Sequence, residues 1–136
     1  MIDLTLAMAE RAVRAAQERA KALGTPMTVT VVDEAGRLVL SARGDGTGFL
    51  TPDTSRAKAV AAAAFRKATG ELGAMVAEHS PFWTLMPTIV RGEALPTNGG
   101  VPIVRGGRVI GGIGCGGGSG EQDHECAAAG AKAAAE

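Results

Sequence analysis

Two predicted β-hairpins constrain the fold of this chain more strongly than any other feature of its sequence. Residues 27–32 and 37–43 form the first around an Asp-Glu-Ala-Gly turn, and residues 101–104 and 108–113 form the second around Arg-Gly-Gly. Both combine strand-forming residues with turn residues where antiparallel neighbours are joined. A parallel sheet needs long crossover connections between its strands, so the pattern favours an antiparallel sheet.

Helical patterns precede, separate and follow the hairpins. Apolar residues recur every three or four positions over residues 6–23, and Asp3 is placed to cap the start of this helix. A Thr-Pro pair opens a second helix, predicted over residues 51 to about 69, because threonine caps a helix and proline fits its first turn. A last helix is predicted over residues 121–136. Helices therefore stand at both ends of the chain.

The middle of the chain combines a short helix with a long irregular segment. The short helix is predicted over residues 71–78, and residues 82–100, which include Pro87 and Pro96, are interpreted as a loop. A loop of this length in a small domain is usually functional or covers an apolar surface. The order of elements predicts one α+β domain over residues 1–136, a sandwich in which helices cover an antiparallel sheet.

The balance between small and large apolar residues predicts an oligomer. The 136 residues include 26 alanines and 20 glycines, but valine, leucine, isoleucine and phenylalanine together number only 28. Small side chains let neighbouring elements approach closely, yet each of them buries little apolar area. Contacts between subunits would supply part of the missing burial, so we expect a homo-oligomer.

Charge and cysteine content limit the partners and the cellular setting. Basic residues number 14, acidic residues number 14, and tyrosine is absent, so the chain lacks the basic, aromatic surface that usually binds nucleic acid. No apolar run is long enough to span a membrane. Cys115 and Cys126 have no zinc-binding spacing and are expected to be reduced. We therefore expect a soluble cytoplasmic protein that binds neither nucleic acid nor a membrane.

Glycines near the second hairpin form the best local signal for a binding site. Gly114, Gly116 and Gly117 belong to a glycine-rich turn between the last strand and the last helix. Converging backbone amides and the helix dipole suit such a turn to a carboxylate or phosphate, although a tight structural turn is the simpler interpretation. Gly99 and Gly100 precede the hairpin and place flexible backbone near the same end of the sheet. Their alternative interpretation is a bend at the strand entry.

The two histidines are candidates for acid-base catalysis or iron ligation, because neutral imidazole serves both. His79 lies beside Phe82 and Trp83, an apolar setting in which a flat ligand fits. Its alternative role is to end a helix, where the dipole favours histidine. His124 falls in the first turn of the last helix beside two acidic residues, where surface exposure is the simpler interpretation.

Cations and a cysteine complete the candidate groups. Arg43, Arg56 and Lys58 are predicted to form either a basic patch around the second helix or a solvated face. Cys115 lies in the glycine-rich turn, where a helix N-terminus would lower the pKa of its thiol and produce a reactive thiolate.

Two carboxylates are predicted to be structural rather than catalytic. Asp33 begins the first hairpin turn, where its side chain is placed to accept hydrogen bonds from turn amides. Asp123 lies in the first turn of the last helix, where the orphan amides of the helix need acceptors.

Several segments, taken in order, resemble the GlcG/HbpS-like heme-binding or heme-degrading domain family. They cover nearly the whole chain: Val31–Val39, Ala42–Gly46, Ala57–Ala59, Gly99–Ile103, Val109–Gly117, Gln122–Asp123 and Ala127–Gly130. The resemblance implies an α-β-α sandwich with a roughly five-stranded antiparallel sheet, close to profilin-like folds, and assembly into dimers or octamers. It also implies binding of heme or related tetrapyrroles in some members, including those fused to corrinoid adenosyltransferases.

The sequence departs from the family pattern near the glycine-rich turn. Cys115 and Gly116 stand where the pattern more often has valine and serine, and His124 stands where it more often has glutamate. The family's axial ligand is threonine or histidine in different members, and His79 is the candidate iron ligand here. Fold alone does not establish chemistry, so the resemblance leaves the activity open.

Three interpretations of the function follow. The first is a small oligomeric protein that binds heme or another tetrapyrrole, with Arg43, Trp83 and the glycines named above around the ligand. The alternative is a cofactor-independent isomerase, lyase or hydrolase of small molecules, in which amides of the glycine-rich turn hold an oxyanion. His79, His124, Lys58 or Cys115 would then transfer a proton or attack the substrate. A structural oligomer without a ligand is the third interpretation.

Overall fold

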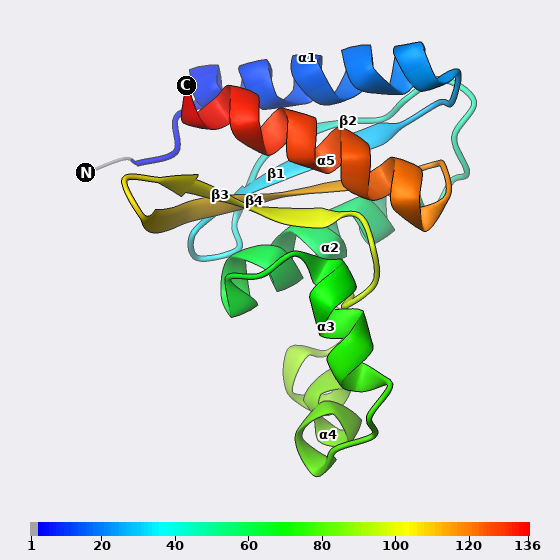
Figure 1. Cartoon of the computed structure of the whole chain (residues 1–136), viewed down its shortest axis with the longest axis vertical. Helices are drawn as coiled ribbons and strands as arrows, with labels where there is room; N and C mark the ends of the chain where they lie inside the picture. The colour runs from blue at the N-terminus through cyan, green and yellow to red at the C-terminus, as the bar shows by residue number, and fades with distance from the viewer. Residues whose placement is uncertain (1–2) are drawn as a thin grey trace.

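The protein is an α-β-α sandwich built on a four-stranded antiparallel sheet. A computed structural model describes residues 3–136, and Figure 1 shows helices on both faces of the sheet. The strand order is β2-β1-β4-β3. The elements in chain order are α1 (Leu6–Leu23), β1 (Thr28–Asp33), β2 (Leu38–Ala42), α2 (Thr51–Phe65), α3 (Thr69–Val76), α4 (Pro81–Val90), β3 (Gly100–Arg105), β4 (Arg108–Gly116) and α5 (Gly120–Ala135).

The predicted α+β class and both hairpins are confirmed, but the predicted number of strands is wrong. Hairpins β1–β2 and β3–β4 meet through an antiparallel pairing of β1 with β4, in which Val31 lies opposite Ile113. The described residues form four strands rather than about five. The resemblance implied the fifth strand, whereas the two hairpins predicted from the sequence pattern account for all four strands.

The structure corrects the prediction that residues 82–100 form a loop. Residues Pro81–Val90 form a helix, α4, and Ser80 is its N-cap. The Ser80 side chain accepts a hydrogen bond from the backbone N–H of Trp83 at 3.5 Å. Pro81 favours this start because a proline in the first turn needs no N–H donor. Pro87 lies inside the helix, and the left-handed conformation of Arg91 ends it. Only the part after α4 is irregular.

Two predicted helix caps are also wrong. Thr5, not Asp3, caps α1 by accepting a hydrogen bond from the backbone N–H of Met8 at 3.1 Å. Asp3 forms an ion pair with Arg108 instead. Leu50 occupies the cap position of α2, and Thr51 is already helical.

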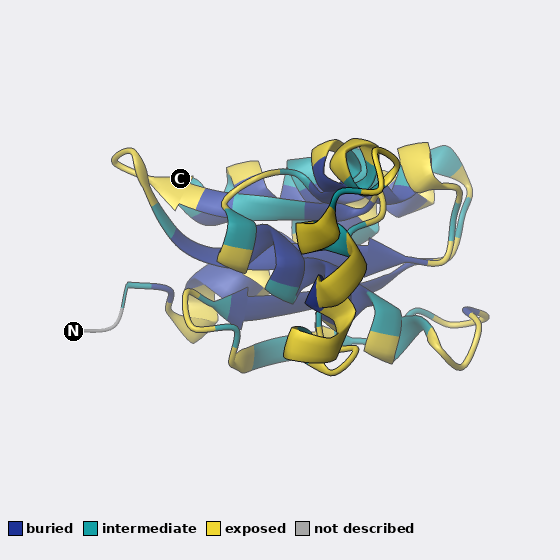
Figure 2. Ribbon diagram, turned by 90° about the horizontal axis from the view of Figure 1, so that it is seen from below, coloured by how far each residue is buried: buried dark blue, intermediate teal, exposed yellow. Residues whose placement is uncertain are grey.

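Small residues bring the helices close to the sheet, as the alanine and glycine content predicted. A Cβ atom added to Gly112 would collide with the carbonyl oxygen of Ala59 on α2, and one added to Gly130 would lie 2.7 Å from the carbonyl oxygen of Ala12 on α1. Figure 2 shows burial concentrated in the sheet and in the helix faces turned toward it. The largest fully buried side chains include Met27, Leu72, Ile103 and Ile113, which supply apolar volume that alanine and glycine lack.

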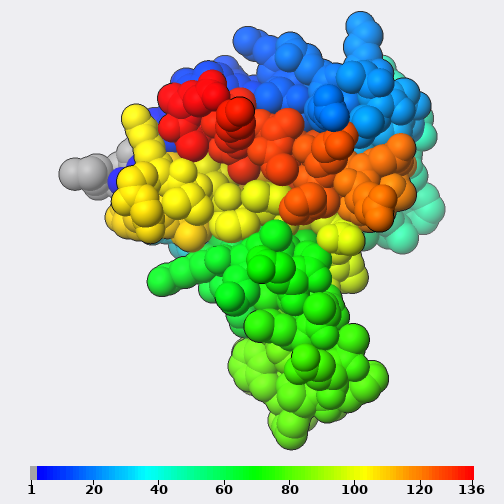
Figure 3. Space-filling view, viewed as in Figure 1, coloured from blue at the N-terminus to red at the C-terminus, as the bar shows by residue number. Residues whose placement is uncertain are grey.

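One part of the protein stands apart from this core. Helices α3 and α4 extend away from α2 and from the sheet, and we call them the α3–α4 arm (Figures 1 and 3). Of their residues, only Thr69, Leu72 and Met86 are buried.

Candidate functional site

A buried ion pair joins three elements at one end of the sheet. Lys58 on α2 places its Nζ atom 3.1 Å from Oδ2 of Asp123 on α5 and 3.0 Å from the carbonyl oxygen of Cys115 on β4. The side chains of Lys58 and Asp123 are only 9% and 6% exposed. The pair therefore ties α2 to α5 across the end of β4, and its ammonium is enclosed rather than presented to a substrate.

The predicted glycines at the strand entry surround this pair. A Cβ atom added to Gly99 would lie 2.9 Å from Nζ of Lys58, and one added to Gly100 would collide with the Lys58 carbonyl oxygen. The Gly100 amide donates to Oγ1 of Thr69 at 2.8 Å. The fold thus brings the predicted candidates Lys58, Gly99, Gly100 and Cys115 together, and all four are buried.

Two amides of the turn before α5, those of Gly118 and Ser119, already have acceptors within the chain. The backbone N–H of Gly118 donates to Oδ1 of Asp123 at 2.9 Å, and that of Ser119 donates to Oε1 of Gln122 at 2.9 Å. The backbone N–H of Gln122 donates in turn to Oγ of Ser119, which completes a capping box. Asp123 therefore has the structural role predicted for it. An external anion would have to displace this carboxylate, so the oxyanion-binding enzyme gains no support here.

Gly114 and Gly116, predicted to lie in the turn, belong to strand β4, and only Gly117 lies beyond the end of the strand. A Cβ atom on Gly114 would collide with the carbonyl oxygen of Ser55 on α2, and one on Gly116 would lie 3.2 Å from Oγ1 of Thr54. Gly117 has a φ of 137°, a conformation that L side chains rarely adopt. Gly114 and Gly116 are buried between the sheet and α2, whereas Gly117 is exposed.

The predicted activation of Cys115 is wrong in direction. Burial raises the pKa of the Cys115 thiol well above its ordinary value, and the nearby Cys126 and Asp123 add to this effect. Burial is also the main reason that the pKa of Cys126 rises, to about 11. Both cysteines are free and buried, as expected for reduced cysteines, but neither is a thiolate at neutral pH.

We expect neither thiol to react with iodoacetamide in the folded protein at pH 8. The thiolate is the reactive form, and the raised pKa values keep both groups protonated and buried. Mass spectrometry after timed labelling measures this, with the urea-unfolded chain as the control in which both cysteines react. Rapid labelling of Cys115 alone in the folded protein would restore the interpretation of an activated thiolate.

The predicted basic patch is not formed as a unit. Lys58 is buried against Asp123, whereas Arg43 and Arg56 are exposed. One guanidinium nitrogen of Arg43 donates to the carbonyl oxygen of Thr47 at 3.5 Å, the outer limit for a hydrogen bond. Lys58 therefore does not contribute to an exposed basic surface, because two acceptors enclose its ammonium.

Asp33 has the structural role predicted for it. Its Oδ1 atom accepts hydrogen bonds from the backbone amides of Ala35 at 2.9 Å and Arg37 at 3.0 Å. Partial burial raises the pKa of this carboxyl, but these amides and the Arg37 guanidinium outweigh it and lower the pKa overall. The carboxylate therefore stabilises the first hairpin turn in its charged form.

The two histidines lie in different surroundings. His124 is half-buried on α5, and among residues 3–136 its buried Nδ1 atom has no hydrogen-bond partner. His79 is exposed in the turn that joins α3 to α4 within the arm, where it has a left-handed φ of 56°. The structure thus presents one imidazole, that of His79, on the surface of the α3–α4 arm.

Helix α4, which follows His79 in the sequence, exposes several large apolar side chains. The ring of Phe65, at the end of α2, lies 6.2 Å from that of Phe82 and 5.1 Å from that of Trp83, measured between centroids. Phe82, Leu85 and Ile89 are 59%, 63% and 79% exposed. Figure 3 shows the arm protruding from the body of the protein. Large exposed apolar groups of this kind mark binding or interaction surfaces.

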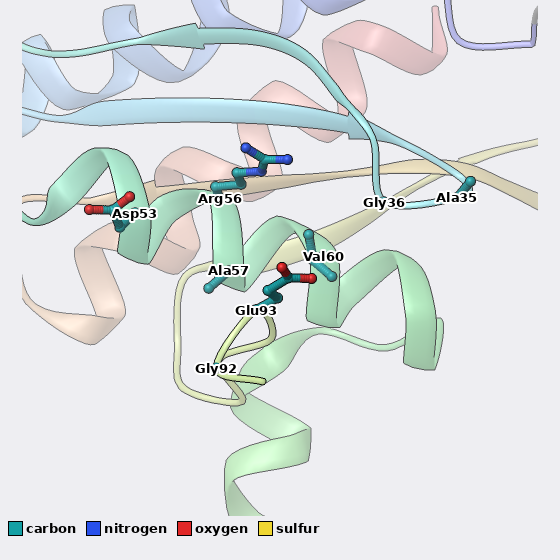
Figure 4. A pocket seen from close by; sticks show the side chains of 8 residues that line it. All are labelled: Ala35, Gly36, Asp53, Arg56, Ala57, Val60, Gly92 and Glu93. Carbon is teal, nitrogen blue, oxygen red and sulfur yellow. The ribbon is translucent and has the colours of Figure 1, made fainter. Parts of the chain in front are cut away.

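One cavity was not predicted from the sequence. It has a volume of about 320 Å³ and lies on the side of α2 between the β1–β2 turn and the segment that follows α4 (Figure 4). Its charged lining residues are Asp53, Arg56 and Glu93. The sequence does not indicate this cavity, because its walls come from segments far apart in the chain. Two of the lining residues, Gly36 and Gly92, are glycines in left-handed turns.

Residues 3–136 contain neither a cluster of metal-ligating side chains nor a membrane-spanning helix. These residues contain no group of three or more histidine, cysteine, aspartate or glutamate side chains that could hold a metal ion. None of the helices formed by these residues is both long and apolar enough to cross a membrane.

Solved structures share the fold over nearly the whole chain. HbpS from Streptomyces reticuli, solved as a double mutant, is 35% identical with a TM-score of 0.85, and the match covers 95% of this chain and 85% of that one. The PduOC:heme complex is 31% identical with a TM-score of 0.87, covering 96% and 94%. Klebsiella pneumoniae protein ORFY is 26% identical with a TM-score of 0.89, covering 96% and 89%.

Relatives found by sequence also match most of this chain. An uncharacterized 15.0 kDa protein from the dhaT-dhaS intergenic region of Citrobacter freundii is 32% identical over 88% of this chain and 84% of its own length. The corrinoid adenosyltransferase PduO of Salmonella typhimurium is 34% identical over 84% of this chain, which spans only 34% of that enzyme. The family model described as "Haem degrading protein HbpS-like" matches residues 4–132. The chain therefore belongs to the HbpS-like family of haem degrading proteins.

Proposed function

We propose that this protein binds heme or a related tetrapyrrole on the α3–α4 arm, with His79 as the iron ligand. The observation that carries the proposal is the exposed imidazole of His79 on an arm that also exposes Phe82, Leu85 and Ile89. The heme complex of PduOC, a structure 31% identical to this chain, supports heme as the ligand.

The residues of the arm fit the chemistry of heme. The imidazole of His79 supplies a nitrogen ligand, and the rings of Phe82 and Trp83 offer apolar surface to a flat macrocycle. Exposed cations, Arg66 at the end of α2 and Arg91 at the end of α4, are suited to the two propionates. When bound, heme supplies a redox-active iron. The chain contributes the ligand nitrogen, the apolar contacts and the positive charge.

Heme titration of the ligand-free protein should give a Soret band that saturates at a fixed ratio of heme to protein. We expect His79→Asn to weaken binding at least tenfold and to shift this band, because it removes the only exposed imidazole of the described chain. Asparagine tolerates the left-handed backbone of His79, so the fold is preserved.

The matched control for this titration is His124→Asn, which removes the other histidine. Its Nδ1 atom is buried, so we expect this variant to bind heme like the unaltered protein. Absence of a saturable band in the unaltered protein would overturn heme binding. An equal loss in both histidine variants, or a loss only in His124→Asn, would remove His79 from the iron.

We also propose that the arm takes part in a homo-oligomer, in the range from dimer to octamer. Binding sites for small molecules usually bury most of the surface of the ligand, and an open arm on one subunit covers only one side of a macrocycle. A second copy placed against the exposed face of α4 would cover the other side and bury the apolar residues Leu85 and Ile89.

Light scattering at micromolar concentration should therefore give a mass above that of one 13.7 kDa chain. Leu85→Asp combined with Ile89→Asp should reduce this mass, because charged groups at these positions oppose apolar contact between copies. Both residues are exposed within one chain, so circular dichroism of the variant should stay unchanged. A monomer for the unaltered protein would refute the proposed oligomer.

A further inference from the structure

The cavity beside α2 is separate from the proposed heme site. Its lining residues come from the β1–β2 turn, from α2 and from the segment after α4, and none belongs to the α3–α4 arm. Its volume of about 320 Å³ falls at the lower end of the range for small-molecule sites. The cavity therefore suits a ligand much smaller than a tetrapyrrole.

Charged groups of both signs line this cavity without pairing. Arg56 and Asp53 lie one turn apart on α2, and Glu93 approaches from the segment after α4 (Figure 4). All three side chains are exposed, and within residues 3–136 none of them forms an ion pair or a side-chain hydrogen bond. The guanidinium and the two carboxylates at this cavity therefore have no partner within residues 3–136 and are available to a ligand.

The walls between these charges are apolar and fixed by the backbone. Ala57 and Val60 on α2 form one wall, and Gly36 forms another without adding a side chain. The backbone N–H of Leu95 donates to the Ala57 carbonyl oxygen at 3.0 Å, which fastens the segment carrying Glu93 to α2. The backbone segments that carry the opposite charges are therefore joined beside a small apolar surface.

We propose that this cavity binds a small zwitterion, namely a free α-amino acid with an apolar side chain. Its carboxylate would face Arg56, its ammonium would face Glu93 and Asp53, and its side chain would contact Ala57 and Val60. A simple anion would satisfy Arg56 but lie near two carboxylates, and a simple cation would satisfy the carboxylates but lie near Arg56. A ligand with both charges complements all three groups.

The test begins with ligand-detected NMR of the heme-free protein against the twenty standard amino acids, followed by calorimetric titration with three matched probes. L-leucine carries both charges, 4-methylpentanoate lacks the ammonium, and 3-methylbutylamine lacks the carboxylate. We expect saturable binding of an apolar amino acid with a dissociation constant of about 1 mM, since the charged groups are exposed. Each truncated probe should bind about tenfold more weakly, the loss expected for one charge-assisted hydrogen bond.

Charge-neutral variants assign the binding to this cavity. Arg56→Gln and Glu93→Gln should each weaken amino-acid binding about tenfold, whereas Arg14→Gln and Glu10→Gln on the exposed face of α1 should leave it unchanged. Because no cavity residue belongs to the arm, the Soret titration should be the same in all four variants.

The proposal would be overturned by any of three results. The first is the absence of saturable binding by every amino acid in the NMR screen. The second is binding of either truncated probe as tightly as L-leucine, which would indicate a simple ion site. The third is unchanged binding in both Arg56→Gln and Glu93→Gln.

Discussion

Asp123→Ala is expected to lower the free energy of unfolding by about 3–5 kcal/mol, because it leaves the ammonium of Lys58 buried without its counterion. The carbonyl oxygen of Cys115, 3.0 Å away, remains as an acceptor but carries no charge. The amide of Gly118 also loses its acceptor, Oδ1 of Asp123, at the start of α5. Urea denaturation followed by circular dichroism measures the loss.

A surface ion pair of the same protein provides the matched control. Arg19 and Glu125 lie 2.9 Å apart with side chains 47% and 45% exposed, so Arg19→Gln should cost only about 0–1 kcal/mol. Both pairs attach to α5, and they differ mainly in burial. A loss in Asp123→Ala no larger than that in Arg19→Gln would show that water reaches Lys58, and the buried pair would then not be a structural tie.

A double variant separates the charge from the packing. Lys58→Met combined with Asp123→Asn removes both charges and keeps a side-chain oxygen that can accept from the Gly118 amide. We expect it to be more stable than Asp123→Ala, since replacing both members of a buried pair is usually better tolerated than breaking it from one side. The comparison tests whether the cost of Asp123→Ala comes from an uncompensated charge.

Local features of the fold were predictable from sequence because their causes are local. The first hairpin turn depends on Asp33, whose carboxylate accepts from the Ala35 and Arg37 amides only two and four residues away. Gly24 ends α1 in a left-handed conformation, as a glycine before Thr-Pro indicates. The missed helix, α4, shows the limit of this reasoning. Pro87 favours a loop over this segment, but Pro81 stands where the first turn of a helix accepts proline.

The candidate site was only partly predictable because burial is a property of the whole fold. Lys58, Gly99 and Cys115 were singled out separately, but only the packing of α2 against β4 shows that they meet in one enclosed cluster. The same packing reverses the expected shift in the pKa of Cys115, because this residue lies inside β4 rather than at the start of α5 and is shielded from solvent. No pattern in the sequence places Glu93 near Arg56.

Gly114→Ala is expected to destabilise the protein by about 3 kcal/mol or more, or to prevent folding. The added Cβ would collide with the carbonyl oxygen of Ser55 and lie 2.8 Å from the backbone N of Ala59, so it meets the backbone of α2 and not a movable side chain. The helix would have to move away from the sheet, and overpacking of this kind is among the few causes of large losses.

The control for this prediction is Gly48→Ala, at a glycine with nothing within 4 Å of the added Cβ. We expect its free energy of unfolding to change by less than about 0.5 kcal/mol, as at ordinary surface positions. Urea denaturation compares the two variants directly, and a failure of Gly114→Ala to fold would appear as lost circular dichroism in the absence of urea. A small loss in both would mean that α2 can shift at little cost. The close approach of α2 to β4 would then not be what requires glycine at position 114, and this strand glycine would need another explanation.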